Sequence, residues 1–190
     1  MENILSVFLG LGLASAAGFR IFVPLLITNI ASLLGLYQFD GGMEWMGTWT
    51  ALAILLSATL AEIAAYYVPW LDHLLDTIAL PASIMAGTIL ATSFVNIDDP
   101  TLKWALGLIV GGGAAGIVQA GTSLLRLGST ATTGGLANPI VATSENIFAI
   151  ILSILSLILP ILMAVCAFIF LVYIARKILN RKVDKTIQKL

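Results

Sequence analysis

Charged side chains inside apolar segments are the residues of this sequence most able to do chemistry. Arg20 lies in the middle of an otherwise apolar run from Ile4 to Leu36. A guanidinium does not lose its proton, so in apolar surroundings it needs a carboxylate, backbone carbonyls, water or an anionic ligand. Glu62, Arg126 and Glu145 likewise lie within or at the ends of apolar segments. Because a charge at mid-membrane costs at least about 2.5–3.5 kcal/mol on insertion scales, these positions predict a use for each charge.

Two interpretations of these four charges remain open. The two arginines and two glutamates can neutralise each other in buried pairs that only hold helices in register. Alternatively, one arginine is left partly free to bind an anionic group, and a carboxylate, Glu62 or Glu145, pairs with an arginine or carries a proton.

A polar but uncharged segment over residues 128–143 is a second candidate site. It is rich in Ser, Thr and Gly, and Gly134-Gly135 allows backbone N–H groups to converge in a nest that favours anions. Asn138-Pro139 is typical of an N-cap followed by Pro at the first helical position. We expect either a re-entrant loop that lines a polar cavity or an ordinary loop outside the membrane. Its candidate ligand-binding residues are Ser129, Thr130, Thr133 and Asn138.

Asp72 and Asp76 are one helical turn apart and share a face, with His73 beside them. Such a pair can hold a divalent cation, as in intramembrane prenyltransferases, but a second acidic motif is lacking apart from Asp98-Asp99. The favoured interpretation of the pair is therefore the solvated face of an interfacial helix. With one His, one Cys and no recognisable nucleophile–base pair, an enzyme is the least favoured class, and we expect no catalytic residue, cofactor or bound metal.

Composition places these residues in a membrane protein. The 190 residues are 59% hydrophobic and only 10% charged, with a mean hydropathy of +1.05. A soluble domain carries roughly 25% charged residues, so a soluble protein is excluded. The last fifteen positions hold most of the basic residues, and by the positive-inside rule this tail, 176–190, is cytoplasmic. They are Arg176, Lys177, Arg181, Lys182, Lys185 and Lys189.

The elements that must position the charges are predicted to be helices. We expect one all-α, polytopic transmembrane bundle over 1–175, with broken or kinked helices. Segment 4–36 is too long for one upright span of about 20 residues, so it is either one tilted helix or two pieces that meet near Gly18. Five spans, or six if a long segment folds back, are predicted at 4–36, 49–68, 81–95, 102–127 and 144–175, with an amphipathic helix at 70–80.

Small residues recur at helical spacing in two of these segments. Gly10, Ala14 and Gly18 share one helix face, and 107–116 is similarly rich in glycine. Such faces let helices approach closely in lipid, within one chain or between copies, so we expect a homo-oligomer. Residues 11–18 also resemble 106–116, and an arginine follows each within about ten residues. This suggests an internal repeat, parallel or inverted, of the kind found in transporters.

Several motifs together resemble a family of small bacterial integral membrane proteins known only as a domain of unknown function, over about residues 8–160. The resemblance implies an inner-membrane protein whose matching residues are mostly polar and lie near membrane segments, as a ligand site requires. It adds Gln119 to the candidates, whereas His73 and the basic tail are not part of the pattern. The motifs are Ala17-Gly18-Phe19-Arg20, Phe22-Val23-Pro24, Pro69-Trp70-Leu71-Asp72, Leu75-Asp76-Thr77, Pro81, Gln119, Gly121-Thr122-Ser123, Arg126, Ser129-Thr130, Thr133-Gly134-Gly135, Asn138-Pro139 and Glu145.

The sequence therefore favours a transporter or channel for a small polar or anionic solute, with Arg20 and Arg126 attracting the anion. A lipid transporter or scramblase that holds a phosphate headgroup is the alternative, and a non-transporting membrane subunit is a third. Expected partners are the lipid bilayer, the solute and further copies of the chain, with no nucleic acid.

Overall fold

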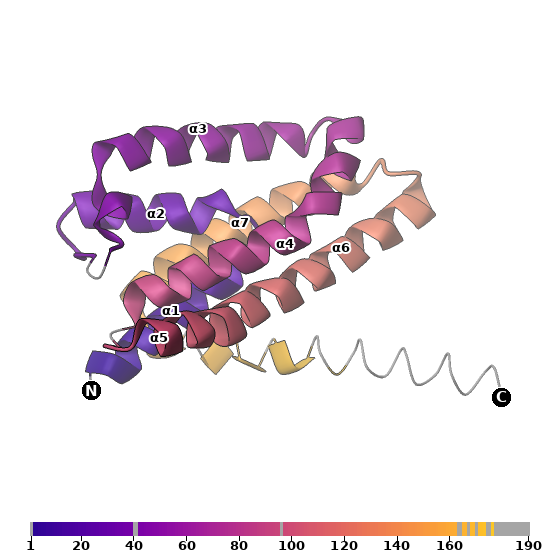
Figure 1. Ribbon diagram of the computed structural model, residues 1–190. Helices are drawn as coiled ribbons and strands as arrows, with labels where there is room; N and C mark the ends of the chain where they lie inside the picture. Colours follow the sequence, from indigo (N-terminus) through magenta and orange to yellow (C-terminus); the bar gives the residue numbers. More distant parts are fainter. Residues whose placement is uncertain are drawn as a thin grey trace.

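The computed structural model describes residues 2–39, 42–95, 97–162, 165–166, 168–169, 171–173 and 176, and within them every regular element is helical (Figure 1). The prediction of an all-α fold is confirmed. In chain order the elements are α1 (Glu2–Ala17), α2 (Phe22–Leu33), the 3-10 helix η1 (Glu44–Gly47), α3 (Trp49–Ala65), α4 (Pro69–Phe94), α5 (Pro100–Leu106), the π-helix η2 (Gly107–Gly112), α6 (Gly113–Thr133) and α7 (Asn138–Ile158).

Three stretches of helix are long and apolar enough to cross a membrane: Leu75–Phe94, Pro100–Thr133 and Asn138–Ile158. The second stretch joins α5, η2 and α6 without a break. Shorter apolar helices cover Leu5–Ala17, Phe22–Leu33 and Trp49–Ala65, so the predicted spans at 4–36 and 49–68 correspond to shorter pieces. Large apolar side chains such as Ile109, Ile147 and Ile154 remain exposed on the outside of the long helices, as a lipid environment requires.

The segment 4–36 folds as two pieces, the second of the two arrangements that the sequence allowed. α1 ends at Ala17, and α2 begins at Phe22 and runs back beside α3 and α7 (Figure 1). Gly18 lies at the break, where a Cβ would be 2.5 Å from the carbonyl oxygen of Ala115 in α6. Close packing of this corner against α6 therefore places the break, and Arg20 with it, inside the protein.

The predicted amphipathic helix 70–80 and the span 81–95 are one helix, α4. Pro81 lies inside it, at a position where proline removes one backbone hydrogen bond and commonly kinks a helix. The sequence predicts a helix boundary at Pro81 because proline favours the first turn of a helix. Packing of α4 against α1, η2 and α6 on several sides overrides that local preference.

The irregular loop expected over 128–143 is mostly helical. α6 continues to Thr133 and α7 begins at Asn138, so only residues 134–137 connect them. The threonine hydroxyls donate back along the helix, Thr132 Oγ1 to the Gly128 carbonyl and Thr133 Oγ1 to the Ser129 carbonyl, each at 2.8 Å. Threonine hydroxyls can therefore be hydrogen-bonded inside a helix, which lets a hydroxyl-rich sequence remain helical.

The connection between α6 and α7 is tight because two glycines adopt left-handed backbone conformations, with φ of 63° at Gly134 and 88° at Gly135. The helix start was predicted within one residue. However, Asn138 is the first helical residue and not a side-chain N-cap. Its Nδ2 donates to Thr130 Oγ1 across the turn at 3.2 Å.

α7 begins six residues before the predicted span 144–175 and ends at Ile158. Leu159 leaves the helix, with φ −130° and ψ 61°, so the predicted span 144–175 is interrupted before Pro160. A residue that precedes proline is disfavoured in the α conformation, which explains the position of this break. The basic residues from Lys177 onward lie outside the described residues.

α4 packs against α1, η2 and α6, and α1 also contacts η2 and α6 directly. Gly87 contacts η2 so closely that a Cβ would be 2.6 Å from the carbonyl oxygen of Gly111. One turn further along the same face, the backbone of Ala91 would lie 3.2 Å from a Cβ added to Gly10 of α1. Both small-residue segments thus pack within the chain. The internal repeat stays a prediction, because the helix α1 ends before Arg20 whereas the helix α6 continues beyond Arg126.

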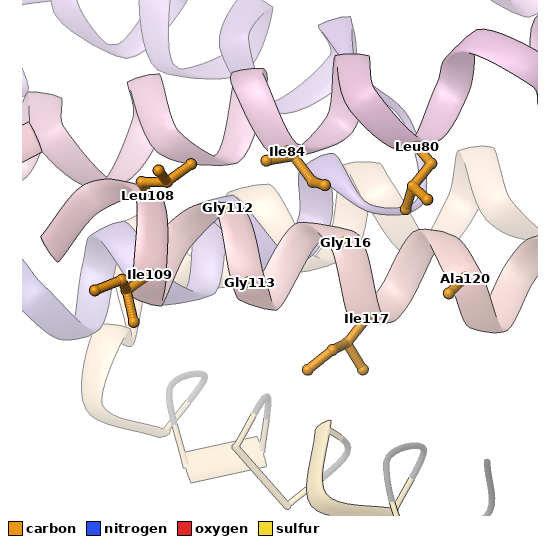
Figure 2. A pocket seen from close by; sticks show the side chains of 9 residues that line it. All are labelled: Leu80, Ile84, Leu108, Ile109, Gly112, Gly113, Gly116, Ile117 and Ala120. Atoms are coloured by element: carbon orange, nitrogen blue, oxygen red, sulfur yellow. The ribbon is translucent and has the colours of Figure 1, made fainter. Parts of the chain in front are cut away.

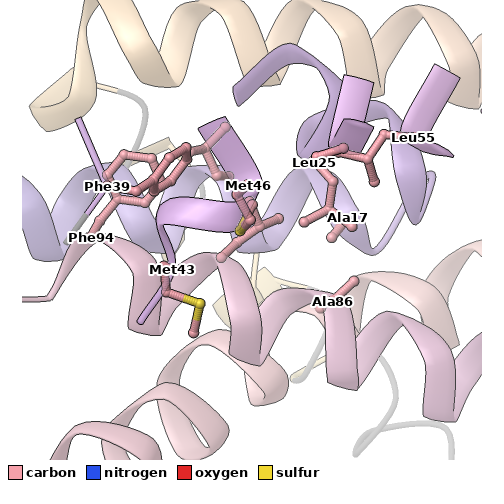
Figure 3. Close-up of a cluster of buried hydrophobic side chains, with 12 residues drawn as sticks. Ala17, Leu25, Phe39, Met43, Met46, Leu55, Ala86 and Phe94 are labelled. Carbon is pink, nitrogen blue, oxygen red and sulfur yellow. The ribbon is translucent and has the colours of Figure 1, made fainter. Parts of the chain in front are cut away.

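A buried apolar cluster fills the space between α1, α2, α3 and α4, near the η1 segment (Figure 3). Met46 of η1 is fully buried, and the Phe39 and Phe94 rings lie 5.9 Å apart. Tyr37 adds a third ring, 4.4 Å from Phe94. This apolar cluster fixes α2 and α3 relative to the C-terminal end of α4.

Candidate functional site

Charged residues from α3, α4, α6, α7 and the α1–α2 break meet inside the bundle. We call this group the arginine–carboxylate cluster. It brings together residues that are up to 125 positions apart in the sequence. Its members are Arg20, Glu62, Tyr66, Asp76, Arg126 and Glu145.

Glu145 of α7 bridges the two arginines. Arg126 Nε donates to Glu145 Oε1 at 3.1 Å, and Arg126 Nη2 donates to Oε2, so the guanidinium grips both oxygens. Arg20 Nη2 lies 3.3 Å from the same Oε2. All three side chains are buried. Two-point contacts of this kind are the strongest ion pairs that arginine makes, and they fix α6 against α7.

Asp76 of α4 belongs to the same group. Its Oδ1 accepts a hydrogen bond from Arg126 Nη1 at 3.0 Å. The side chain of Asp76 is 28% exposed, whereas that of Arg126 is 4% exposed. The sequence had singled out Asp76 as one half of a metal-binding pair with Asp72. The side chains of Asp72 and His73 lie outside the described residues, among which no group of three or more His, Cys, Asp or Glu side chains lies close enough to hold a metal.

Tyr66, at the end of α3, was missed by the sequence argument. The guanidinium carbons of Arg20 and Arg126 each lie 3.9 Å from the centre of its ring. An arginine over an aromatic face is stabilised by about 0.5–2 kcal/mol, the larger value applying when water is excluded. The only available signal was the spacing of Tyr66 four residues after Glu62, which puts both on one face of α3.

Glu62 does not serve as an arginine's ion-pair partner in the way the sequence suggested. Its Oε1 accepts from the backbone N–H of Ile21 at 2.8 Å, and its Oε2 accepts from that of Phe22 at 3.1 Å. These N–H groups begin α2, where Ile21 offers no side-chain cap. A carboxylate at this end also complements the partial positive charge of the helix terminus. Glu62 therefore holds the α1–α2 break in place, and Arg20 with it.

Arg20 is fully buried and incompletely bonded. Its Nη2 donates to the Ala142 carbonyl at 2.9 Å and contacts Glu145. Its Nε and Nη1 are buried and have no hydrogen-bond partner. An unsatisfied buried donor costs about 1–3 kcal/mol, and more when it is charged, so native proteins rarely retain one without water, an ion or a function to explain it.

The other predicted residues lie close by but form separate contacts. Gln119 is buried two helical turns before Arg126 and donates to Ser123 Oγ at 3.3 Å. Beyond Arg126, Thr133 Oγ1 accepts from the backbone N–H of Ala137 at 3.2 Å, and Thr130 bonds to Asn138. Ser129 Oγ is buried without a hydrogen-bond partner. The hydroxyl-rich residues thus close the α6–α7 end of the bundle.

The family model described as "Domain of unknown function (DUF4126)" matches residues 7–180. The chain belongs to the DUF4126 family. The match contains the whole arginine–carboxylate cluster and confirms the resemblance to an uncharacterised family. No curated protein and no solved structure gives a significant match to the chain. Membership in DUF4126 assigns no activity, so a function has to be argued from the site.

An apolar groove lies between α4 and the η2–α6 helix, with a volume of about 520 Å³ (Figure 2). Leu80 lines it and is one helical turn from Asp76 on the same face of α4, so the groove runs toward the partly exposed edge of the cluster. Its other lining residues are Ile84, Leu108, Ile109, Gly112, Gly113, Gly116, Ile117 and Ala120.

Proposed function

We propose that this protein is an integral membrane transporter for a small polar or anionic solute, which binds at Arg20 within the arginine–carboxylate cluster. The observation that carries the proposal is the fully buried guanidinium with unpartnered Nε and Nη1 atoms. Both atoms are donors, so they require a ligand with acceptor oxygens or an anion. A cluster that only held helices together would gain stability by bonding them internally.

The backbone around Arg20 supports a transport role. The apolar segment breaks at residues 18–21, and irregular backbone inside a membrane protein is tolerated only where protein or a polar cavity surrounds it. Transporters commonly build substrate sites at such broken helices. Because Arg20 is fully buried, the solute reaches it only when neighbouring helices move. A carrier is therefore favoured over an open channel.

The proposed setting is the bacterial inner membrane, with the basic tail in the cytoplasm and the protein assembled as a homo-oligomer. The three long apolar helices support a membrane location. The accumulation of lysine and arginine after position 175 supports the orientation through the positive-inside rule.

The test is flux of radiolabelled nitrate, chloride, inorganic phosphate and L-lactate into proteoliposomes that contain the full chain. We expect flux of at least one anion, with a loss of tenfold or more in Arg20→Lys, which keeps the charge but removes Nε and Nη1 as planar donors. Lys103→Ala removes a cation outside the cluster and serves as the matched control. Thermal unfolding in detergent must show that both variants fold. Wild-type flux in a folded Arg20→Lys protein would refute the site.

A lipid transporter is the second candidate, and the apolar groove supports it. The groove extends from near Asp76 along α6 for about twelve residues, or roughly 18 Å, which is suited to an acyl chain with its headgroup near the cluster. Scrambling of fluorescent phospholipid in the same proteoliposomes tests it. Scrambling without anion flux would replace the first proposal by the second, and neither activity in folded protein would favour a structural subunit.

A further inference from the structure

The net charge of the arginine–carboxylate cluster disfavours the binding of an anion by itself. Its described members provide two guanidinium groups, Arg20 and Arg126, and three carboxyl groups, those of Glu62, Asp76 and Glu145. Fully ionised, these groups already carry one excess negative charge. Because electrostatic interactions are strong where water is excluded, a bound anion would add repulsion to a group that is already negative.

We propose that the solute is a monovalent oxyanion and that it binds together with one proton, which Asp76 takes up. This inference rests on the proposed function and specifies its substrate class and its coupling. Anion and proton together leave the net charge of the cluster unchanged. The carrier would therefore move them as an electroneutral pair.

Asp76 is assigned as the proton acceptor by comparing the three carboxyl groups. Both oxygens of Glu62 accept backbone N–H groups at the start of α2. Both oxygens of Glu145 are held by Arg126, and one also contacts Arg20. These two side chains are buried, whereas that of Asp76 is 28% exposed. A proton from solution thus reaches Asp76 without breaking the α2 cap or the Glu145 bridge.

The groups around Asp76 agree with this assignment. From α6, Arg126 donates to Asp76 Oδ1, and from the end of α3, the Tyr66 ring lies against Arg126. From α7, Glu145 shares Arg126 with Asp76. Arg20 at the α1–α2 break, with Glu62 of α3 behind it, completes the charged surroundings. On α4 itself the neighbouring titratable residues are Asp72 and His73, whose side chains are outside the described residues.

The step balances without any other reactant. The Asp76 carboxylate gains one proton and becomes a neutral carboxylic acid, so Arg126 loses one of its negative neighbours. The cluster then carries no excess negative charge, and an oxygen of the anion accepts a hydrogen bond from one of the unpartnered Arg20 donors, Nε or Nη1. Release reverses both events, and no covalent bond forms or breaks except the O–H bond at Asp76.

The donors of Arg20 favour an oxyanion over a halide. The N–H bonds on Nε and Nη1 point to different sides of the guanidinium, so one small anion bonds at one of these two positions. An oxyanion offers several acceptor oxygens there, whereas a halide offers a single acceptor atom. Nitrate, which stays ionised at every pH of interest, is therefore the probe of choice, with chloride for comparison.

The test is calorimetric titration of nitrate into the detergent-solubilised full chain, in two buffers that differ in heat of ionisation. The difference in heat gives the number of protons taken up for each nitrate bound. We expect one proton per nitrate at pH values where Asp76 is ionised, with affinity falling about tenfold per pH unit in that range. Nitrate binding with no proton uptake would overturn the inference and leave the proposed function standing.

Asp76→Asn mimics the neutral acid and retains an oxygen for Arg126, so we expect it to bind nitrate with no proton uptake and no dependence on pH. His73→Ala is the matched control, and it should behave as the wild type. Proton uptake that persists in Asp76→Asn, or that disappears in His73→Ala, would overturn the assignment.

A second measurement is independent of that variant's folding. In wild-type proteoliposomes an inward nitrate gradient should acidify the lumen, as reported by a trapped pH dye, at the same rate with and without an imposed membrane potential. Acidification that follows the potential would refute electroneutral coupling. If none of the four radiolabelled anions shows flux, the proposed function falls, and this inference with it.

Discussion

Asp76 and Phe94 lie about 27 Å apart along α4, and the surroundings of these two residues differ in kind. Near Phe94, aromatic and methionine side chains fill the space, and Ser93 donates to the Ile89 carbonyl at 2.7 Å within the helix. Near Asp76, five charged groups lie close to one tyrosine. The most buried of them, Arg20, has two N–H groups, Nε and Nη1, without a hydrogen-bond partner. At the apolar end the buried atom without a hydrogen-bond partner is a neutral amide oxygen, Asn29 Oδ1 beside Met46. At the charged end the unpartnered atoms belong to a guanidinium, whose burial costs more, which is why we place the function there.

Removing the bridging carboxylate should have the largest effect. Glu145→Ala leaves Arg20 and Arg126 buried beside each other, and loss of one partner of a buried ion pair costs about 3–5 kcal/mol. We expect a strongly lowered unfolding temperature in detergent. Glu145→Gln, which keeps the shape and one acceptor oxygen, should lie between this variant and the wild type. Equal stability of all three proteins would show that the charged end contributes nothing to the scaffold.

Glu62→Gln tests whether the charged end positions Arg20. A glutamine has one acceptor oxygen, so one of the Ile21 and Phe22 N–H groups loses its partner, at a cost of about 1–3 kcal/mol. We expect reduced thermal stability together with a weaker nitrate affinity measured by calorimetry.

Phe94→Leu provides the comparison at the apolar end. It should destabilise the protein by a similar amount, about 1–1.5 kcal/mol, and leave nitrate affinity unchanged. If both substitutions weaken nitrate binding equally, stability alone governs affinity and the distinction between the two ends fails.

The smallest effect on stability should come from alanine substitutions at two neighbouring glycines of the apolar groove. A Cβ at Gly112 would lie 2.7 Å from Thr88 Oγ1, whereas a Cβ at Gly113 would meet nothing within 4 Å. Gly112→Ala should therefore destabilise the protein, and Gly113→Ala should stabilise it by up to about 1 kcal/mol through higher helix propensity. Thermal unfolding of both variants checks this. A damaging Gly113→Ala would indicate that a lipid or a second copy packs in the groove.

The sequence predicted the fold class, and it offered a break near Gly18 as one of two arrangements, because glycine, proline and apolar length act locally. It also identified Arg20, Arg126 and Glu145 as buried charges. It did not predict that Glu62 bonds to backbone N–H groups 40 positions away, or that Tyr66 lies against two arginines. Those contacts depend on how α3 packs against the α1–α2 break, and no local pattern encodes that packing.

The errors have a similar origin. The hydroxyl-rich residues near Thr133 were predicted to form a loop because serine and threonine are common in loops, although their hydroxyls can bond within a helix as well. Asp76 was considered only together with Asp72, either as a cation-binding pair or, as the favoured interpretation, as part of a solvated helix face. Its partner Arg126 comes from a different helix, 50 positions later.

The π-helix η2 carries a consequence for every residue that follows it. A π-helical turn holds one residue more than an α-helical turn, so Gly107–Gly112 contains what amounts to an insertion in a regular helix. If the same residues adopted α-helical geometry instead, the rest of α6 would rotate by roughly 100° about its axis. Gln119, Thr122 and Arg126 would then turn away from the interior together. Deleting one residue as the segment becomes α-helical would leave these three side chains in nearly the same orientation, because the deletion removes the residue that the wide turn absorbs. The orientation of the charged end is thus set by the helical geometry of a glycine-rich segment about two turns or more away.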